Sequence, residues 1–466
     1  MADLTEIQSA QSIKIIGSDS TGLEQTPVQS TTGGAVHVNL RTNSGSEITT
    51  LPTSLVGGTD GSVIGNVNDS LKVVNKLPSD YSRGVFGAAR VVSTQNVFES
   101  LFSFDKQPTI WDEVLTTSGT STFNSNTNSV DMSVTLASGS SVVRQTFKRI
   151  RYNPSRAVQL ITAAVIGAGK ANVTKRIGQF DSLDGLFFEQ SGTTMYVVRR
   201  TSTSGAAVDV RTPQSSWNID KLDGTGPSGI TIDFSKHQAF FIQYAFQCFA
   251  DITYGFYLNG QITFCHKEQT GNILTAPFMR TAHLPARVEI TNTGITLSST
   301  TLSYNSFTIK NEGDDSDTEG QIRSYSAAPV KTVGTANTPV ISLRIASGFT
   351  RGILDIISTT ILVQTVDEVI WTLWLSPTLT GATFANASGY AEIDISATAM
   401  VGGTELISGA LTQNNSSTQS SQDLLKLLNS LIGVSINGTS QIITIAGRSR
   451  IGTADVLSTI VWREYP

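Results

Sequence analysis

The feature that most constrains this chain is a long stretch of alternating apolar and polar residues over 177–268, broken only by one turn-rich insert. Turn-forming pairs interrupt the alternation at Asp184-Gly185, Ser191-Gly192, Ser204-Gly205 and Asn259-Gly260. Alternation places successive side chains on opposite faces of an extended backbone, and these pairs suit the tight turns between antiparallel strands. The stretch therefore predicts short antiparallel strands joined by hairpin turns.

The clearest single element is a hairpin over 253–267 with Asn259-Gly260 at its turn. Both turn residues tolerate the positive φ that a type I′ turn requires. The expected cross-strand pairs are Leu258 with Gln261, Phe256 with Thr263 and Tyr254 with Cys265. Both faces of this hairpin are largely apolar, so we expect it to be covered on both sides, as in a sandwich.

Composition also favours strands. Charged residues make up only 15% of the 466-residue chain, against roughly 25% in an average globular protein. Ser, Thr, Asn, Gln and 40 glycines take their place, and these residues favour strands and turns over long helices. We therefore predict an all-β protein with a mostly uncharged polar surface.

Length and patterning predict an extended arm followed by two antiparallel, jelly-roll-like β-sandwiches. The expected parts are an N-terminal arm at 1–82, a connector at 83–141, a central sandwich at 142–300 and a C-terminal sandwich at 301–466. The arm carries too little apolar surface to fold alone. We expect it to become ordered by packing on a partner or on sister chains; the alternative is a leader that docks on nothing.

One helix and two free thiols complete the structural expectations. Leucines at helical spacing predict a short helix from Ser421 to Leu431, with its apolar face on its own sheet or on a partner. Strand alternation puts Cys248 and Cys265 on opposite faces of one sheet. A disulfide needs close, facing Cβ atoms, so we expect buried free thiols.

Charge and hydropathy limit the partners. The net charge is −5, so no basic field attracts nucleic acid. No apolar run reaches the roughly 18 residues of a membrane span, and the first eleven residues lack the pattern of a secretion signal. We therefore expect a chain that matures in a cytosol without a membrane span.

Possible ligand sites are few, and no cofactor is expected. Alternating Asp315, Asp317 and Glu319 could offer oxygen ligands to calcium, although the run lacks the length and closing glutamate of an EF-hand loop. A solvated loop is the alternative, so no metal is predicted. The basic run over 144–151 could bind phosphate, but a solvated strand face, offset by Asp181, Asp184 or Glu189, explains it better. Glycines at 224, 226 and 229 match a dinucleotide motif only as a string, because Pro227 and a strand-like segment follow where a helix should start.

Catalytic motifs are absent from the sequence. The four histidines, His37, His237, His266 and His283, lie apart, and no metal-binding histidine pair or nucleophile motif occurs. We therefore predict no enzyme activity, although paired carboxylates for glycoside cleavage stay open because sequence separation says nothing about spatial distance. Trp217, Tyr196 and Tyr304 are candidates for stacking on sugar rings.

Several long segments carry a resemblance. The central ones lie at 151–165, 175–200, 212–244, 252–266 and 284–294, and include KRIGQFDSLDGLFFEQSGTTMYVVRR and ITYGFYLNGQITFCH. Together with SIKIIGSDSTGLEQTPVQSTTGGAVHVNL near the start and the segment at 376–409, they resemble β-rich virion structural proteins of tailed bacteriophages and large DNA viruses, of the fibre or decoration type. The resemblance implies a capsid- or tail-associated part and brings no catalytic residues.

Three functions follow as expectations. The first is a peripheral structural protein of a phage virion, assembled in the host cytoplasm. It would dock on head, neck or tail subunits through its arm, and would be a homo-oligomer, such as a trimer. The alternative is a tail fibre protein that binds a host receptor or surface glycan. A polysaccharide-degrading enzyme is a weaker third option, because no long β-helix repeat is present.

Overall fold

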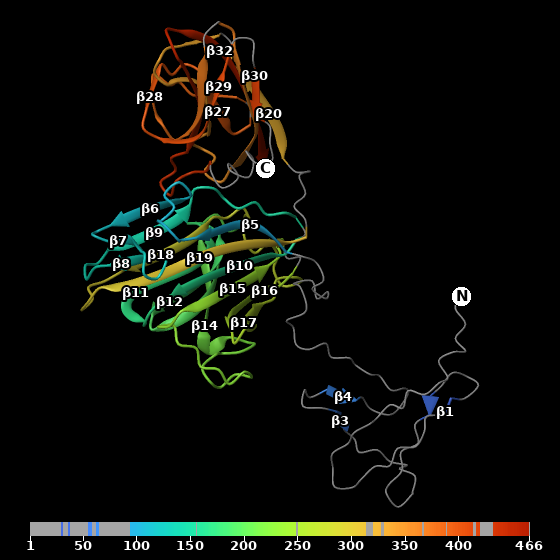
Figure 1. Cartoon of the computed structure of the whole chain (residues 1–466). Helices are drawn as coiled ribbons and strands as arrows, with labels where there is room; N and C mark the ends of the chain where they lie inside the picture. The colour runs from blue at the N-terminus through green and yellow to red at the C-terminus, as the bar shows by residue number, and fades with distance from the viewer. Residues whose placement is uncertain are drawn as a thin grey trace, which may run out of the picture. The chain divides into compact units, whose positions relative to one another are not determined.

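The computed structural model describes residues 94–465, except 155, 248–249, 314–319, 328–329, 366–367, 388, 413–415 and 420–431 (Figure 1). Within 1–93 it describes only four short strands, β1 (Gln29–Ser30), β2 (Val36–His37), β3 (Leu55–Gly57) and β4 (Ser62–Ile64). The chain divides into two units, Met1–Ser82 and Arg83–Pro466. The helix predicted at 421–431 and the candidate ligands Asp315, Asp317 and Glu319 lie outside the described residues, as does most of the predicted arm.

The larger unit is all-β, as predicted. Every strand pairing that the structure describes in it is antiparallel. The only helical element among its described residues is a single 3-10 turn, η3 (Gln214–Ser216). Its strands form two sandwiches, each with one buried apolar core.

The first sandwich consists of two sheets. Sheet A runs in the order β17 (Gln261–Glu268), β16 (Ile252–Leu258), β15 (Gln238–Tyr244), β10 (Val158–Val165), β19 (Thr300–Glu312), β8 (Ser129–Val134) and β7 (Thr120–Asn124), with β5 (Thr94–Leu101) also paired to β19. Sheet B runs β14 (Val208–Pro213), β13 (Thr194–Thr201), β12 (Gly185–Gly192), β11 (Lys170–Phe180), β18 (Ala286–Asn292), β9 (Ser141–Thr146) and β6 (Trp111–Thr116).

Aromatic rings join these two sheets. Phe188 of sheet B lies 5.1 Å from Phe240, 5.6 Å from Tyr254 and 5.0 Å from Phe256, measured between ring centroids. All four side chains are buried. Each such pair adds about 0.5–1.5 kcal/mol beyond the burial of its area, so this cluster fixes how the sheets pack.

The second sandwich has the same plan. Sheet C runs β20 (Gln321–Ser326), β32 (Ala454–Tyr465), β23 (Ile353–Val363) and β30 (Ser416–Gln419), with β21 (Lys331–Val333) also paired to β32. Sheet D runs β26 (Ala385–Asn386), β27 (Ala391–Asp394), β22 (Thr338–Ile345), β31 (Ile442–Ser449), β24 (Val369–Leu375) and β29 (Thr404–Leu411), and β25 (Thr378–Thr380) pairs with β28 (Ala399–Val401). Trp462 of sheet C and Leu373 of sheet D share the core.

The observed strand membership differs from the predicted borders. Strands β5, β6, β7 and β8 belong to the sheets of the first sandwich, so the range predicted as a connector, 83–141, supplies part of that body. Strand β19 crosses the predicted border at 300 and also belongs to the first sandwich. Strands β5, β7 and β19 are rich in Ser, Thr and Asn, which weakens their apolar signal, so composition does not indicate the true borders.

The predicted hairpin forms with one change of register. Asn259 and Gly260 have φ of 52° and 78°, and Leu258 and Phe256 lie opposite Gln261 and Thr263 as expected. A β-bulge next to Gly255 then places Tyr254 opposite His266, so the predicted pairing of Tyr254 with Cys265 is wrong. A bulge inserts one extra residue into a strand, which alternation alone does not show.

The thiol prediction is tested in part. Cys265 is a buried free thiol that donates a 3.4 Å hydrogen bond to the carbonyl oxygen of Tyr254. Burial raises the pKa of this thiol well above its ordinary value, which keeps it protonated and unreactive. Cys248 lies outside the described residues.

A junction centred on Asp181 connects the two sandwiches. Asp181, in the turn between β11 and β12, accepts hydrogen bonds of 2.8 Å from Arg149 of the first sandwich and from Arg351 of the second. Arg351 also pairs with Asp184 at 2.8 Å. Lys148 pairs with Asp355 across the same junction. Both Asp181 and Asp184 are buried, so these ion pairs attach the second sandwich to the first.

The hairpin turn gives a test of backbone conformation. A Cβ at Gly260 or at Gly334 would meet no atom within 4 Å, but only Gly260 has a positive φ. We expect Gly260→Ala to lower the free energy of unfolding by roughly 1 kcal/mol, while Gly334→Ala leaves it unchanged or slightly raised. Urea unfolding measures both. Equal effects at the two positions would contradict the positive-φ turn.

Candidate functional site

The residues predicted to stack on sugars are mostly unavailable. Trp217 is 3% exposed and Tyr304 is fully buried, so neither can present a ring face to a ligand. Tyr196 is half-buried on β13. The predicted sugar platform is therefore not formed by this set.

The basic run over 144–151 does not form the solvated face that alternation suggested. The Arg144 guanidinium is buried, 5.5 Å from the ring centroids of both Phe102 and Trp111, and it donates a hydrogen bond to the hydroxyl oxygen of Tyr304. Arg149 pairs with Asp181 at 2.8 Å. Arg144 and Arg149 are therefore used inside the protein and are not presented to phosphate.

Arginines also cover the outer face of sheet B, in what we call the arginine layer. Its members are Arg176, Arg200, Arg211 and Arg287, with Glu189, Glu289 and Asp209. Arg176, Arg200 and Arg287 lie over the buried rings of Phe180 and Phe187, whose centroids are 4.4 Å apart. The Arg200 guanidinium lies 5.2 Å from the centroid of Phe187.

Each carboxylate of the layer is matched by arginine. Arg176 bridges Glu189 at 2.6 Å and Glu289 at 3.0 Å. Arg211 pairs with the other oxygen of Glu189 at 3.0 Å, and Arg200 pairs with Asp209 at 2.7 Å. The two glutamates therefore lie near each other, as a carboxylate pair for glycoside cleavage would.

The electrostatics of Glu289 do not suit acid catalysis. Glycoside cleavage needs one carboxyl group with a raised pKa, protonated at neutral pH, as the proton donor. Burial alone would raise the pKa of Glu289, but the charges of Arg287 and Arg176 and their hydrogen bonds outweigh it and lower the pKa. Glu289 is therefore an anion held by arginine, and we interpret the layer as structural.

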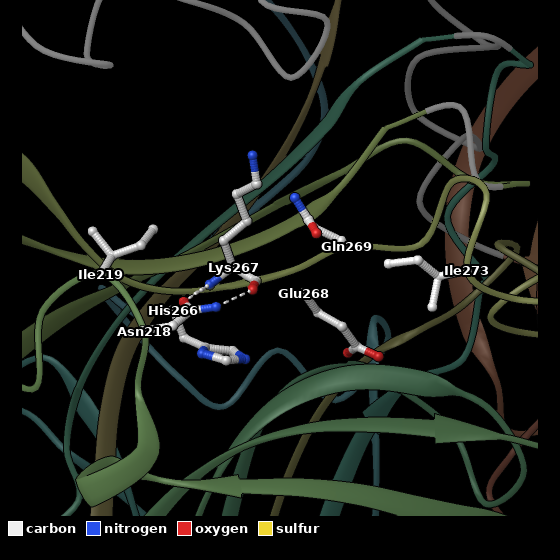
Figure 2. Close-up of a pocket in the computed structure, with 7 residues that line it drawn as sticks. All are labelled: Asn218, Ile219, His266, Lys267, Glu268, Gln269 and Ile273. Atoms are coloured by element: carbon white, nitrogen blue, oxygen red, sulfur yellow. Dashed lines mark hydrogen bonds between the residues drawn. The ribbon is translucent and has the colours of Figure 1, made fainter.

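A cavity of about 470 Å³ lies beside edge strand β17 (Figure 2). Its lining residues are Asn218, Ile219, His266, Lys267, Glu268, Gln269 and Ile273. Figure 2 shows the His266 and Glu268 side chains on one side of the strand and those of Lys267 and Gln269 on the other, as strand alternation requires. The volume lies within the range of about 300–1,000 Å³ typical of small-molecule sites.

The segment after η3 forms one wall of this cavity by pairing with the edge of β17. The Asn218 side chain donates to the carbonyl oxygen of Lys267 at 2.8 Å and accepts from its N–H at 2.9 Å. The N–H groups of Ile219 and Asp220 both donate to the carbonyl oxygen of Cys265 at 3.1 Å. The side chain and backbone of this segment thus take the place of a neighbouring strand.

The charges of the cavity are balanced. Lys267 pairs with Asp251 at 2.8 Å, and Glu268 pairs with Arg199 at 2.7 Å. Burial lowers the pKa of His266 below its ordinary 6.5, so its imidazole is neutral at pH 7. The cavity therefore carries no uncompensated charge.

His266 has an unsatisfied polar atom. The residue is 8% exposed, and its Nδ1 atom is buried with no hydrogen-bond partner among the described residues. Leaving a buried polar atom unpaired costs about 1–3 kcal/mol, so such an atom in a native structure requires an explanation. The sequence shows His266 only as one of four histidines far apart along the chain. Its place beside a cavity depends on the 218–220 segment, which pairs with β17 only in the folded protein.

Metal binding finds no support in the described part of the chain. Within it, no group of three or more His, Cys, Asp or Glu side chains is placed to hold an ion. The same residues include no helix long and apolar enough to cross a membrane.

Comparisons with known proteins give no family. No family model matches the chain, and no curated protein matches it. Similar solved structures include a protein of unknown function from Shewanella oneidensis. It is 9% identical, the match covers 48% of this chain and 90% of that chain, and the TM-score is 0.33. A putative β-glucanase from Mycobacterium abscessus has 9% identity over 46% of this chain and 100% of its own, with a TM-score of 0.33.

A legume lectin-like domain from Entamoeba histolytica has 12% identity over 47% of this chain and 98% of its own, with a TM-score of 0.29. These TM-scores are too low to support an argument about this chain. The class of protein is therefore defined by its own structure, which is a pair of antiparallel β-sandwiches joined by buried ion pairs.

The arginine layer gives a test of its structural role. Glu289→Gln removes a buried charge that Arg176 and Arg287 share, and we expect it to lower the free energy of unfolding by about 3 kcal/mol at pH 7. Because the folded pKa of Glu289 is lowered, this stability is present above the ordinary carboxyl pKa and is lost as the pH falls through the folded value. The difference between variant and wild type should therefore shrink in acid.

A matched control is Glu368→Gln. The Glu368 side chain is 53% exposed and pairs with Arg450 at 3.2 Å, so we expect a loss below about 1 kcal/mol. Urea unfolding at neutral and acidic pH measures both variants. A Glu289→Gln variant as stable as the control variant would contradict a structural role for the layer.

Proposed function

We propose that this chain is a structural component of a phage virion, attached to head, neck or tail through its N-terminal segment, and without catalytic activity. The observation that carries the proposal is the Asp181 junction, where one buried carboxylate binds arginines from both sandwiches. Buried ion pairs of this kind are lost at high cost when one partner is removed. Such ion pairs suit a structural protein whose two sandwiches must stay joined.

Two further observations support a non-catalytic part. Glu289 of the arginine layer is held as an anion by Arg176 and Arg287, so it cannot serve as the protonated acid of a glycosidase. Cys265 is buried, and its raised pKa removes the thiolate that a nucleophile would need. The resemblance of the sequence segments to virion structural proteins supports the location on a particle.

The N-terminal segment is the proposed attachment point. The unit Arg83–Pro466 has its own cores, and Met1–Ser82 forms a separate unit. Deleting Met1 to Leu77 should therefore change the free energy of unfolding of the sandwiches by less than about 1 kcal/mol. Such a change leaves their melting temperature within about 2 °C of that of the full chain. The same deletion should abolish incorporation into particles, measured by mass spectrometry of purified virions.

The melting temperature serves as the control for folding in that experiment. A truncated chain that melts normally and enters particles at the level of the full chain would overturn the attachment proposal. The proposed homo-oligomer is tested separately by the mass of the full chain in solution. A monomer at micromolar concentration would contradict it.

The second candidate function is binding of a host-surface glycan. Its specific support is the cavity beside β17, whose charged lining residues are paired with other side chains. This cavity could hold a sugar, whereas Trp217 and Tyr304 are buried. A glycan array probed with full-length protein tests it. Binding of any glycan above background supports this function, and a silent array contradicts it.

A further inference from the structure

We propose that the cavity beside β17 binds one uncharged, polyhydroxylated unit, such as a single sugar ring of a neutral glycan. The inference rests on the second candidate function and does not depend on virion assembly. It assigns a site, a class of ligand and the side chains that recognise the ligand. The argument uses the charge balance, the hydrogen-bonding groups and the apolar rim of the cavity.

Charge selects an uncharged ligand. Both charged side chains of the lining are neutralised by their own partners, Lys267 by Asp251 at 2.8 Å and Glu268 by Arg199 at 2.7 Å. An anionic ligand would have to compete with Asp251 for Lys267, and a cationic one with Arg199 for Glu268. A neutral ligand enters without breaking either pair.

The hydrogen-bonding groups select hydroxyls. The His266 imidazole lines the cavity, and the Glu268 carboxylate next to it keeps acceptor capacity beyond its bond to Arg199. Figure 2 shows these two side chains pointing to the same side of β17. A hydroxyl group can both donate and accept, so adjacent hydroxyls of one ring can satisfy both residues.

The rim selects a ligand with an apolar face. Ile219 and Ile273 stand at the two sides of the labelled group in Figure 2, and they are 38% and 60% exposed. Exposed branched aliphatic side chains beside polar groups provide contact area for the C–H groups of a ring. A ring that carries hydroxyls at its edge and C–H groups on its face matches both parts of the cavity.

The same edge is unsuited to an added peptide strand. Strand addition needs free main-chain N–H and C=O groups along an edge. At β17 the N–H and C=O groups of Lys267 already bond to Asn218, and the carbonyl oxygen of Cys265 accepts from Ile219 and Asp220. A peptide would have to displace this segment, whereas a small ring would not.

The test uses the full chain and neutral monosaccharides and oligosaccharides, first on an array and then by calorimetry. We expect binding of at least one neutral glycan, with affinity reduced at least tenfold by Ile273→Asp and by His266→Ala. Ile273 is exposed, so we expect its replacement to leave the fold intact. His266→Ala removes the hydrogen-bonding ring.

Two controls are matched by residue type. Ile295 is 81% exposed on a different loop of the same sandwich, and Ile295→Asp should leave the affinity unchanged. His237 is exposed and bonds to Asn305 at 2.9 Å, so His237→Ala should also leave it unchanged. Equal losses in the control variants would overturn the assignment of the site.

Three outcomes would overturn the proposal. These are no binding of any neutral glycan, binding of charged glycans only, and binding that Ile273→Asp reduces less than twofold. Displacement of a bound glycan by an unrelated peptide would also count against it, because it would indicate a strand-binding edge. None of these results bears on incorporation into particles, so the two proposals can fail separately.

Discussion

The Asp181 carboxylate is the interaction on which the architecture of residues 83–466 depends. It accepts hydrogen bonds from Arg149 and Arg351 at 2.8 Å, and from the N–H groups of Leu183 and Asp184 at 2.7 and 2.9 Å. Burial alone would raise the pKa of Asp181, but the two arginines and the backbone donors together hold it below the ordinary value. The carboxylate therefore remains ionised at neutral pH, and the turn that positions it also positions the second sandwich.

Many of the few charged residues of this chain form contacts inside the folded protein. With only 15% charged residues, the protein still places several arginines in buried or half-buried positions over aromatic rings, such as Arg144 near Trp111 and Arg200 over Phe187. A guanidinium can stack on a ring and bond to a carboxylate at the same time, which a lysine ammonium does less well. The charges thus act mainly within the molecule.

Local structure was predictable because it follows from nearest neighbours. Alternation gave the strands, and Asn259-Gly260 gave a turn with two positive φ angles. The register failed at Tyr254, where a bulge at Gly255 adds a residue that no periodic pattern reveals. The range 83–141 was misread for a related reason: its strands have one polar face, so a Ser- and Thr-rich sequence resembled a connector.

Long-range pairing was not predictable in the same way. Asp181 and Arg351 are 170 positions apart, and the turn signal at Asp184-Gly185 gave no reason to look for a partner in another body. Arg149 was an exception, because Asp181 could be considered as its counter-charge from sequence. The cavity could not be predicted from sequence because one of its walls forms only when Asn218 bonds to Lys267, 49 positions away.

The junction and the cavity place different demands on the same fold, and the fold separates them. Asp181 lies in the β11–β12 turn of sheet B, whereas the cavity lies at β17, the edge strand of sheet A. We therefore expect replacement of a lining residue such as Ile273 to leave the ion pairs of Asp181 intact. A binding surface at the edge of sheet A is therefore compatible with a firm junction between the two sandwiches, because the two depend on separate sets of hydrogen bonds.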